Sequence, residues 1–165
     1  MLPLVPYGAM YHTISNKDFR IPLLLEPNER IRLTFDESTT FETQKVVRFV
    51  PSENDKFDAL LIQKSGIYSI ECTFGPTNSD QANLSVQLMK NNDIIQQISQ
   101  CKHTNDGQLY TGAYQAQSTI AELQAGDIVY FRTQNNSLSQ KATGIQFGAP
   151  FGQLMCTLSV TLVSF

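Results

Sequence analysis

The chain has 165 residues, of which 41% are hydrophobic, 10% aromatic and only 16% charged, and its formal net charge is −3. This length suits one domain with a core large enough to fold without disulfide or metal cross-links. Lys and Arg form no run that would neutralise phosphates, and no stretch approaches the roughly 20 apolar residues of a membrane span. We therefore expect neither a nucleic-acid partner nor a membrane partner.

Strand patterns follow one another along the chain, whereas helical patterns are almost absent. Alternation of apolar and polar residues, typical of half-buried strands, predicts strands at 7–14, 29–35, 45–50, 57–63, 65–74, 83–90, 93–100, 109–123, 127–134 and 154–165. Asn91 and Asn92 predict a hairpin turn, because Asn tolerates the positive φ of tight turns. The segment 118–126 has some helical spacing but is short and runs into Gly126, so we expect an extended segment and a turn.

Eight to ten short strands with turn residues between them, and no helical layer, predict an all-β fold. Its expected architecture is an antiparallel jelly-roll β-sandwich. No internal repeat, low-complexity tract or linker divides the sequence. Residues 1–165 are therefore expected to form a single jelly-roll domain.

The alternation is strictest in the stretch SGIYSIECTF, residues 65–74. One face carries the large or apolar residues Tyr68, Ile70, Cys72 and Phe74. The opposite face carries Ile67, Ser69, Glu71 and Thr73. Period two predicts a strand with one face in a core, but the pattern alone leaves open whether the other face meets water or another subunit.

The sequence offers little of the chemistry that catalysis or metal binding requires. The three cysteines, at 72, 101 and 156, fit no disulfide framework and no zinc motif. Cys72 and Cys156 lie in strand patterns and are expected to behave as buried apolar groups. Cys101 lies in a polar loop beside Lys102 and His103, so we expect an exposed thiol there that could cross-link chains.

Other candidate motifs are also better explained without catalysis. His12 has no nucleophile beside it, and Cys101 and His103 lack a third group that would orient them. The acidic clusters at 36–37 and 53–55 indicate solvated turns rather than a Ca²⁺ loop. The segment TGIQFGAPFG, residues 143–152, lacks the context of a phosphate loop and is either a packed loop or an exposed apolar tip. We expect no catalytic residue, no cofactor, no metal site and no enzymatic activity.

Several segments together resemble the jelly rolls of the tumour necrosis factor superfamily and of the complement-type globular heads. The strand that begins Gly-x-Tyr falls on Gly66 and Tyr68, and LSVQLMKNNDII (84–95) resembles the strand–turn–strand that follows. The segment LQAGDIVYF (123–131) resembles the Gly-Asp element before the next strand. Residues 6–15 are similar to the first strand of the bacterial branch, found in exosporium collagen-like glycoproteins, their anchoring partners and phage appendages. The chain carries no Gly-X-Y collagen stalk and no transmembrane stem.

The resemblance implies a compact homotrimer in which the Tyr68 face of 65–74 fills the sandwich and the opposite face turns toward a threefold axis. It also places Leu158, Val160 and Leu162 of the last strand in the core. The interface implied in this way comprises Ile67, Ser69, Glu71, Thr73, Met155, Thr157, Ser159, Thr161, Val163 and Phe165. Three Glu71 carboxylates close to an axis would repel one another and require a cation or water between them, unless Glu71 is peripheral.

The function expected from these features is a non-enzymatic trimeric surface or structural protein of a spore layer or a virion. Residues 1–13 lack the basic start of a secretion signal, which suits a spore surface or a virion as its location. The alternative is a carbohydrate- or receptor-binding adhesive head. A small jelly-roll enzyme is a third hypothesis, and it would need histidines and carboxylates converging in a pocket. Expected partners are further copies of the chain, and another surface-layer protein or a glycan.

Overall fold

The structure is a computed structural model, and it describes residues 7–11, 23–35, 37–40, 46–52, 56–74, 76–77, 84–101, 115–139, 141–147 and 156–164. Within these ranges the chain is built from strands and turns. The strands are β1 (Tyr7–Tyr11), β2 (Leu23–Leu25), β3 (Arg30–Arg32), β4 (Glu37–Thr40), β5 (Val47–Pro51), β6 (Phe57–Ile62), β7 (Gly66–Phe74), β8 (Pro76–Thr77), β9 (Leu84–Lys90), β10 (Asp93–Cys101), β11 (Gln115–Leu123), β12 (Ile128–Asn135), β13 (Ala142–Phe147) and β14 (Cys156–Ser164).

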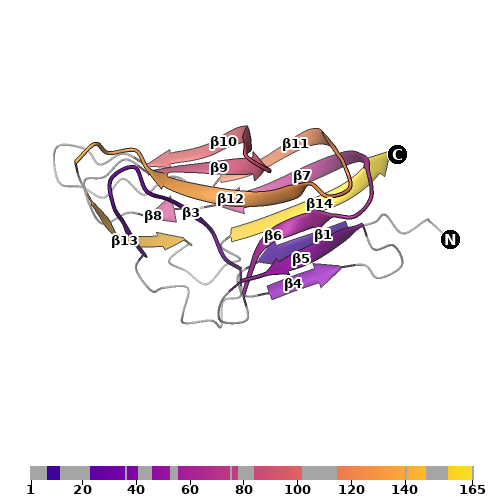
Figure 1. Ribbon diagram of the computed structural model, residues 1–165, viewed down its shortest axis with the longest axis horizontal. Helices are drawn as coiled ribbons and strands as arrows, with labels where there is room; N and C mark the ends of the chain where they lie inside the picture. The colour runs from indigo at the N-terminus through magenta and orange to yellow at the C-terminus, as the bar shows by residue number, and fades with distance from the viewer. Residues whose placement is uncertain are drawn as a thin grey trace.

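Two antiparallel sheets pack face to face. The first sheet has the strand order β11-β7-β14-β1-β4, and the second has the order β10-β9-β12-β6-β5, with β3 added beside β12. A third, small sheet has the order β2-β13-β8. Figure 1 shows the edge strands β10 and β11 along one side of the sandwich and β4 and β5 along the other. The predicted all-β antiparallel sandwich is therefore confirmed.

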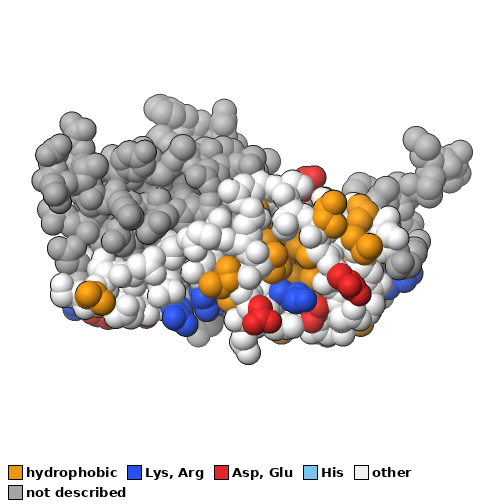
Figure 2. Space-filling model, turned by 90° about the horizontal axis from the view of Figure 1, so that it is seen from above, with side chains coloured by type: hydrophobic (Ala, Val, Ile, Leu, Met, Phe, Trp, Pro, Cys, Tyr) orange, Lys and Arg blue, Asp and Glu red, His pale blue; other side chains and the backbone are white. Residues whose placement is uncertain are grey.

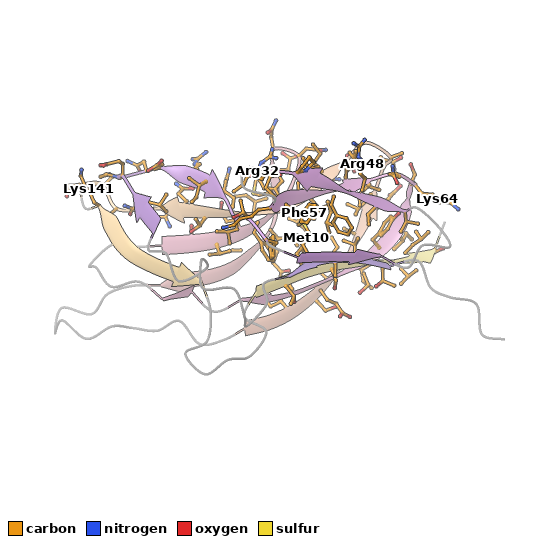
Figure 3. The ribbon with its side chains drawn as sticks, turned by 90° about the horizontal axis from the view of Figure 1, so that it is seen from below. Met10, Arg32, Arg48, Phe57, Lys64 and Lys141 are labelled. Atoms are coloured by element: carbon orange, nitrogen blue, oxygen red, sulfur yellow. The ribbon has the colours of Figure 1, made fainter. Side chains whose placement is uncertain are left out.

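The space between the sheets is filled by the inward residues of both. Tyr68, Ile70 and Cys72 of β7 are buried, as are Leu158, Val160 and Leu162 of β14. The second sheet contributes Val86, Leu88, Val129 and Phe131, and the ring of Phe131 lies 6.0 Å from that of Phe35, centroid to centroid. Figure 3 shows Met10 and Phe57 between the sheets, whereas Arg32 and Arg48 lie on the outer side of the second sheet. The core predicted from period two is confirmed for these residues, and the side chain of Phe74 lies outside the described part.

Two polar groups of β7 lie within this apolar core. The hydroxyl of Tyr68 donates a 2.6 Å hydrogen bond to the carbonyl of Lys64, just before the strand begins. The thiol of Cys72 donates to the carbonyl of Gln117 on the neighbouring β11, at 3.7 Å. Burial raises the pKa of both groups above their usual values, that of Cys72 to about 11. Tyr68 therefore ties the start of β7 to the preceding loop, and Cys72 is held as a neutral thiol.

One polar network fastens two loops at one end of the sandwich. Asn91 begins the β9–β10 turn with the positive φ predicted for it, 54°, and its side chain donates to the Asp127 carboxylate at 2.8 Å and accepts from the Ile128 N–H at 2.9 Å. Asp127 also accepts from the Gln124 N–H at 2.8 Å. Burial of Asp127 opposes its ionisation, but these two hydrogen bonds and the charge of Lys90 outweigh it and lower its pKa.

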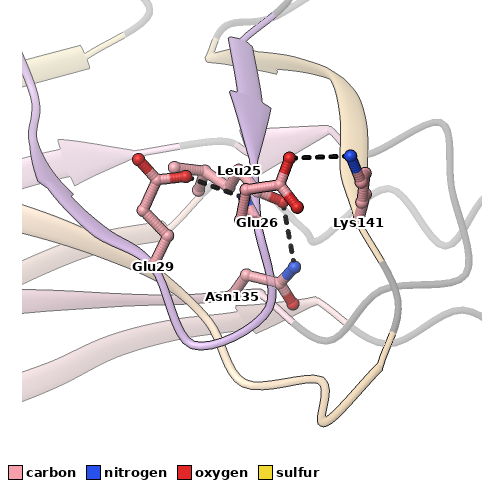
Figure 4. Close-up of polar contacts among 5 residues, drawn as sticks. All are labelled: Leu25, Glu26, Glu29, Asn135 and Lys141. Atoms are coloured by element: carbon pink, nitrogen blue, oxygen red, sulfur yellow. Dashed lines mark hydrogen bonds and ion pairs between the residues drawn. The ribbon is translucent and has the colours of Figure 1, made fainter.

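A second polar cluster joins the small sheet to the second sheet (Figure 4). Asn135, fully buried at the end of β12, donates from its side-chain nitrogen to the carbonyl of Leu25 in β2 at 3.2 Å. Beside it, the Glu26 N–H donates to the Glu29 carboxylate at 2.7 Å, and Lys141 forms a 2.8 Å ion pair with Glu26. Asn135 also starts an Asn-x-Ser sequence, but its nitrogen points into this cluster and is unavailable to a glycosyl group.

The structure differs from the sequence-based expectations in several short segments. The strands β2, β4 and β8 were not predicted, and Glu37, expected in a solvated turn, begins β4 and pairs with Tyr11. Residues 142–147, part of the expected loop, form β13 between β2 and β8. Cys101, expected in a loop, ends β10 opposite Leu84. In each case, pairing with a segment distant in sequence overrides the weak local signal.

We expect replacement of Asp127 by Asn to lower the free energy of unfolding by about 1 kcal/mol at pH 7, because the two donors to the carboxylate lose a charged acceptor. A carboxyl group whose pKa is lowered by folding stabilises the protein above its unfolded pKa, and this contribution disappears as the pH falls through the folded value. The difference between wild type and variant should therefore persist down to the ordinary aspartate pKa of about 4 and shrink as the pH falls below it. Urea unfolding between pH 3 and pH 7 measures it.

Asp93→Asn is the matched control, because Asp93 is an exposed aspartate at the start of β10. Its unfolding free energy should follow that of the wild type across the same pH range. A pH-independent loss of stability in Asp127→Asn would contradict the role assigned to its charge.

We expect Cys72 to resist alkylation in the native protein. With a pKa of about 11, roughly one thiol in a thousand is ionised at pH 8, and the thiolate is the reactive form. Iodoacetamide treatment followed by peptide mass spectrometry should show Cys72 unmodified in buffer and fully modified in 6 M guanidinium chloride. Rapid labelling in buffer would instead indicate that β7 separates from β11 in the native state.

Candidate subunit interface

The outer face of the first sheet, the side turned away from the second sheet, carries the residues that were predicted to form a subunit interface. β7 and β14 are antiparallel neighbours at the centre of this sheet. Their register places Ser69 opposite Thr161, and Glu71 opposite Ser159. Because side chains on one face recur every second residue, these residues and their neighbours along both strands form one continuous surface.

The centre of this outer face is lined with small residues. Ser159 is almost fully buried, and its hydroxyl donates to the carbonyl of Glu71 at 3.4 Å. On the other side of β14, Ala9 of β1 lies directly opposite Ser159 and is also buried. Glu71 itself is exposed. A surface with short side chains at its centre allows another sheet or strand to approach closely.

One end of the face is apolar and exposed. Ile67 of β7 has an exposed fraction of 40%, and Val163 of β14 has one of 54%. Alternation along β14 keeps Leu162 in the core while Val163 points outward, and a register shift lies between Leu162 and Ser164. Large aliphatic side chains that are exposed together on one face are typical of contact surfaces.

The edge strand β11 adds two residues to this face that the sequence analysis did not identify. Ile120 lies opposite Ser69, with an exposed fraction of 71%, and Glu122 lies opposite Ile67 and is exposed. The alternation of β11 indicated its two faces, since Leu123 is buried. It did not indicate that β11 pairs with β7, and this pairing is what places Ile120 beside Ile67.

The structure brings together the predicted residues Ile67, Ser69, Glu71, Thr157, Ser159, Thr161 and Val163 on this one face. Thr73 lies on the same strand opposite Thr157, but its side chain is not described. Met155 and Phe165 lie outside the described residues, as do His12 and His103.

Nothing in the described part of the chain indicates a metal centre. Histidine, cysteine and carboxylate side chains do not gather in threes anywhere within it. The described ranges likewise contain no helix with the length and hydrophobicity needed to cross a bilayer. Within the described residues, the candidate functional sites are the outer surfaces of the two sheets.

Comparison with known proteins gives the family. Residues 54–149 match the C1q domain, and no curated protein matches the sequence. Among solved structures, rabbit GITRL superposes with a TM-score of 0.51 at 18% identity, over 96% of this chain and 93% of that one. The Eiger TNF of S. frugiperda superposes with a TM-score of 0.51 at 13% identity, over 96% of this chain and 94% of that one.

These superpositions show a shared jelly-roll sandwich, and the domain match covers more than half of the chain. The resemblance to the complement-type globular heads is thus confirmed by the domain match, and the resemblance to the tumour necrosis factor jelly rolls is confirmed for the fold. Domains of this group typically form homotrimers and normally bind other molecules without catalysing reactions. The chain belongs to the C1q domain family.

Proposed function

We propose that the protein is a non-enzymatic homotrimer that assembles through the outer face of its first sheet and serves as a surface or structural component of a spore layer or virion. The observation that carries the assembly is the exposed aliphatic group Ile67, Ile120 and Val163 beside the small residues at the centre of that face. Fully burying a large aliphatic side chain contributes about 1.5–3 kcal/mol. Partial burial of three such side chains per copy gives association a substantial driving force.

A closed ring of three copies needs two different surfaces on each copy, because the contact around a threefold axis is heterologous. The edge strand β10 of the second sheet supplies an exposed aliphatic residue outside the first face, Ile94, with an exposed fraction of 52%. Figure 2 looks onto this edge and shows hydrophobic side chains gathered there beside charged ones. We place this edge of one copy against the outer face of the next.

The carboxylates of the face determine how close to the axis it can lie. Glu71 and Glu122 are exposed on strands β7 and β11, and three copies of either residue near an axis would repel one another. Hydroxyl groups of Ser69, Thr157 and Thr161 can hold water between such groups. Val163 on β14, which β7 separates from Glu122, therefore fits closest to the axis, with Glu71 and Glu122 farther out.

The similarity of residues 6–15 to the first strand of the bacterial branch supports the location on a spore layer or virion. Five of these residues form β1 in the first sheet, between β14 and β4, so this segment belongs to the assembling sheet. The alternative function, a carbohydrate- or receptor-binding head, keeps the same trimer. It is favoured by Arg32 and Arg132, which lie opposite one another on the outer face of the second sheet.

Light scattering on a gel-filtration column tests the assembly. Three copies of the 18.5 kDa chain should elute as a species of about 55 kDa. Ile120→Lys should convert this species to monomer, because the ammonium group would lose its water in the contact, while the melting temperature of the separated chain changes little. Mass spectrometry of purified spore layers or particles from the source organism tests the location.

Leu138→Lys is the matched control, because Leu138 is the most exposed large hydrophobic residue in the described chain, at 89%, and follows β12 in the second sheet. It should leave the trimer intact. A monomeric wild type, or a trimer that tolerates Ile120→Lys as well as it tolerates Leu138→Lys, would overturn the assigned face.

A further inference from the structure

A row of four polar side chains crosses the outer face of the second sheet. Arg32 of β3 lies directly opposite Arg132 of β12, Arg132 lies opposite Gln87 of β9, and Gln87 lies opposite Gln97 of β10. All four stand on the side of the sheet away from the core, since their neighbours Val86, Leu88 and Phe131 point inward. We call these four residues the arginine row.

Hydrogen bonds along the row fix the guanidinium group of Arg132. Its Nε and Nη2 atoms both donate to the side-chain oxygen of Gln87, at 2.9 and 2.6 Å. The nitrogen of Gln87 in turn donates to the side-chain oxygen of Gln97 at 3.3 Å. Gln87 is 93% buried, with an exposed fraction of 7%. Arg132 is thus oriented by a neutral amide, which holds the cation in place without neutralising its charge.

Arg32 is held in a different way. Its guanidinium carbon lies 4.1 Å from the centre of the Tyr130 ring, and one of its nitrogens lies 3.9 Å from the carboxylate of Asp58. The hydroxyl of Tyr130 donates to the carbonyl of Asn91 at 2.7 Å, which fixes the ring under the arginine. The side chain of Arg32 remains partly open to solvent. Stacking on an aromatic ring leaves the nitrogen atoms at the guanidinium edge available to an anion.

The charges on this part of the sheet do not balance. Arg30 lies two residues before Arg32 on β3 and is exposed, so three arginines occupy neighbouring positions on this face. Among the described residues, Asp58 is the single carboxylate that contacts them, at the long distance given above. Like charges directly opposite one another on a sheet are destabilising. In a chain whose formal net charge is −3, a local excess of positive charge with fixed geometry indicates a site for an anionic ligand.

We propose that the arginine row binds an acidic polysaccharide through the carboxylate groups of its uronic acid units. Guanidinium groups bind carboxylates with two parallel hydrogen bonds, and Arg32 and Arg132 lie about one strand spacing apart. Gln134, opposite Arg30 on the same face, adds an amide that can bind sugar hydroxyls. An extended acidic glycan lying across the strands would meet these groups in succession.

Other anionic partners fit this face less well. Stacking of nucleic-acid bases needs an open aromatic face, and that of Tyr130 is covered by Arg32, leaving the residue 6% exposed. A protein partner is usually anchored by a side chain in an apolar pocket, and the row itself consists of guanidinium and amide groups. Both arginines lie on β3 and β12, away from the β10 edge that the proposed trimer uses, so the site stays accessible in that trimer and does not depend on it. For the alternative function of an adhesive head, the arginine row supplies a binding site and a class of ligand.

Calorimetric titration of the full chain with hexagalacturonic acid tests the proposal. The wild type should bind it, with an affinity that falls as salt is added, and neutral maltohexaose should give no heat. Arg32→Gln and Arg132→Gln should each weaken binding by about tenfold, as expected for the loss of one charge-assisted contact. Arg48→Gln, an exposed arginine of β5 on the same outer face but away from the row, is the matched control and should change the affinity less than about twofold.

The variant Gln87→Glu tests whether weaker binding comes from the loss of positive charge or from a destabilised fold. The new carboxylate would neutralise Arg132 while keeping its geometry, so it should weaken binding about as much as Arg132→Gln without lowering the melting temperature. Light scattering should show that the variants keep the oligomeric state of the wild type. A loss of glycan binding can then be distinguished from a failure of the trimer to assemble. Absence of binding by the wild type, or equal losses in Arg48→Gln, would overturn the site. Equal affinity for poly-glutamate or for a single-stranded oligonucleotide would overturn the polysaccharide as its ligand.

Discussion

The pairing of β7 with β14 at the centre of the first sheet determines what both sides of the molecule present. In this register Ile70 and Val160 stand side by side in the core, and Glu71 and Ser159 stand side by side on the outer face. A shift of β7 by one residue would exchange its faces and place Glu71 in the core. Such a shift is opposed by the hydrogen bond from the Tyr68 hydroxyl to the carbonyl of Lys64, just before the strand begins. The composition of the outer face follows from the same constraint.

Much of this arrangement can be predicted from the sequence, because the signals are local. The alternation of Tyr68, Ile70 and Cys72 predicts a buried face directly, and Asn91 predicts its turn through a backbone preference of the residue itself. The segment 118–126 was correctly expected to be extended and to end in a turn, since Gly126 takes a φ of 98° there. Patterns of this kind depend on residues a few positions apart in the sequence. The fold class follows from the number of strand patterns along the chain.

The remaining features depend on which distant strands become neighbours. Ile120 joins the outer face of the first sheet only because β11 pairs with β7, and the sequence around it indicates nothing about that choice. The arginines are a clearer case. The absence of a basic run along the chain was correct as a statement about sequence, yet alternate positions of β3 and one position of β12 bring Arg30, Arg32 and Arg132 together. In a β-sandwich a basic surface is assembled across strands, so a search along the sequence does not find it.

The two outer faces have different chemistry, and this difference allows the sheets to serve different purposes. The first sheet presents short hydroxyl side chains and exposed Ile67 and Val163, which favour close contact with a similar surface. The second presents charged and amide groups that are already oriented by Gln87 and Tyr130, and which would lose hydration if they were buried against another protein. A trimer formed through the first sheet turns the second sheet outward in every copy. Three arginine rows would then lie around one particle, so that a long acidic chain could reach more than one of them and bind more tightly than to a single copy.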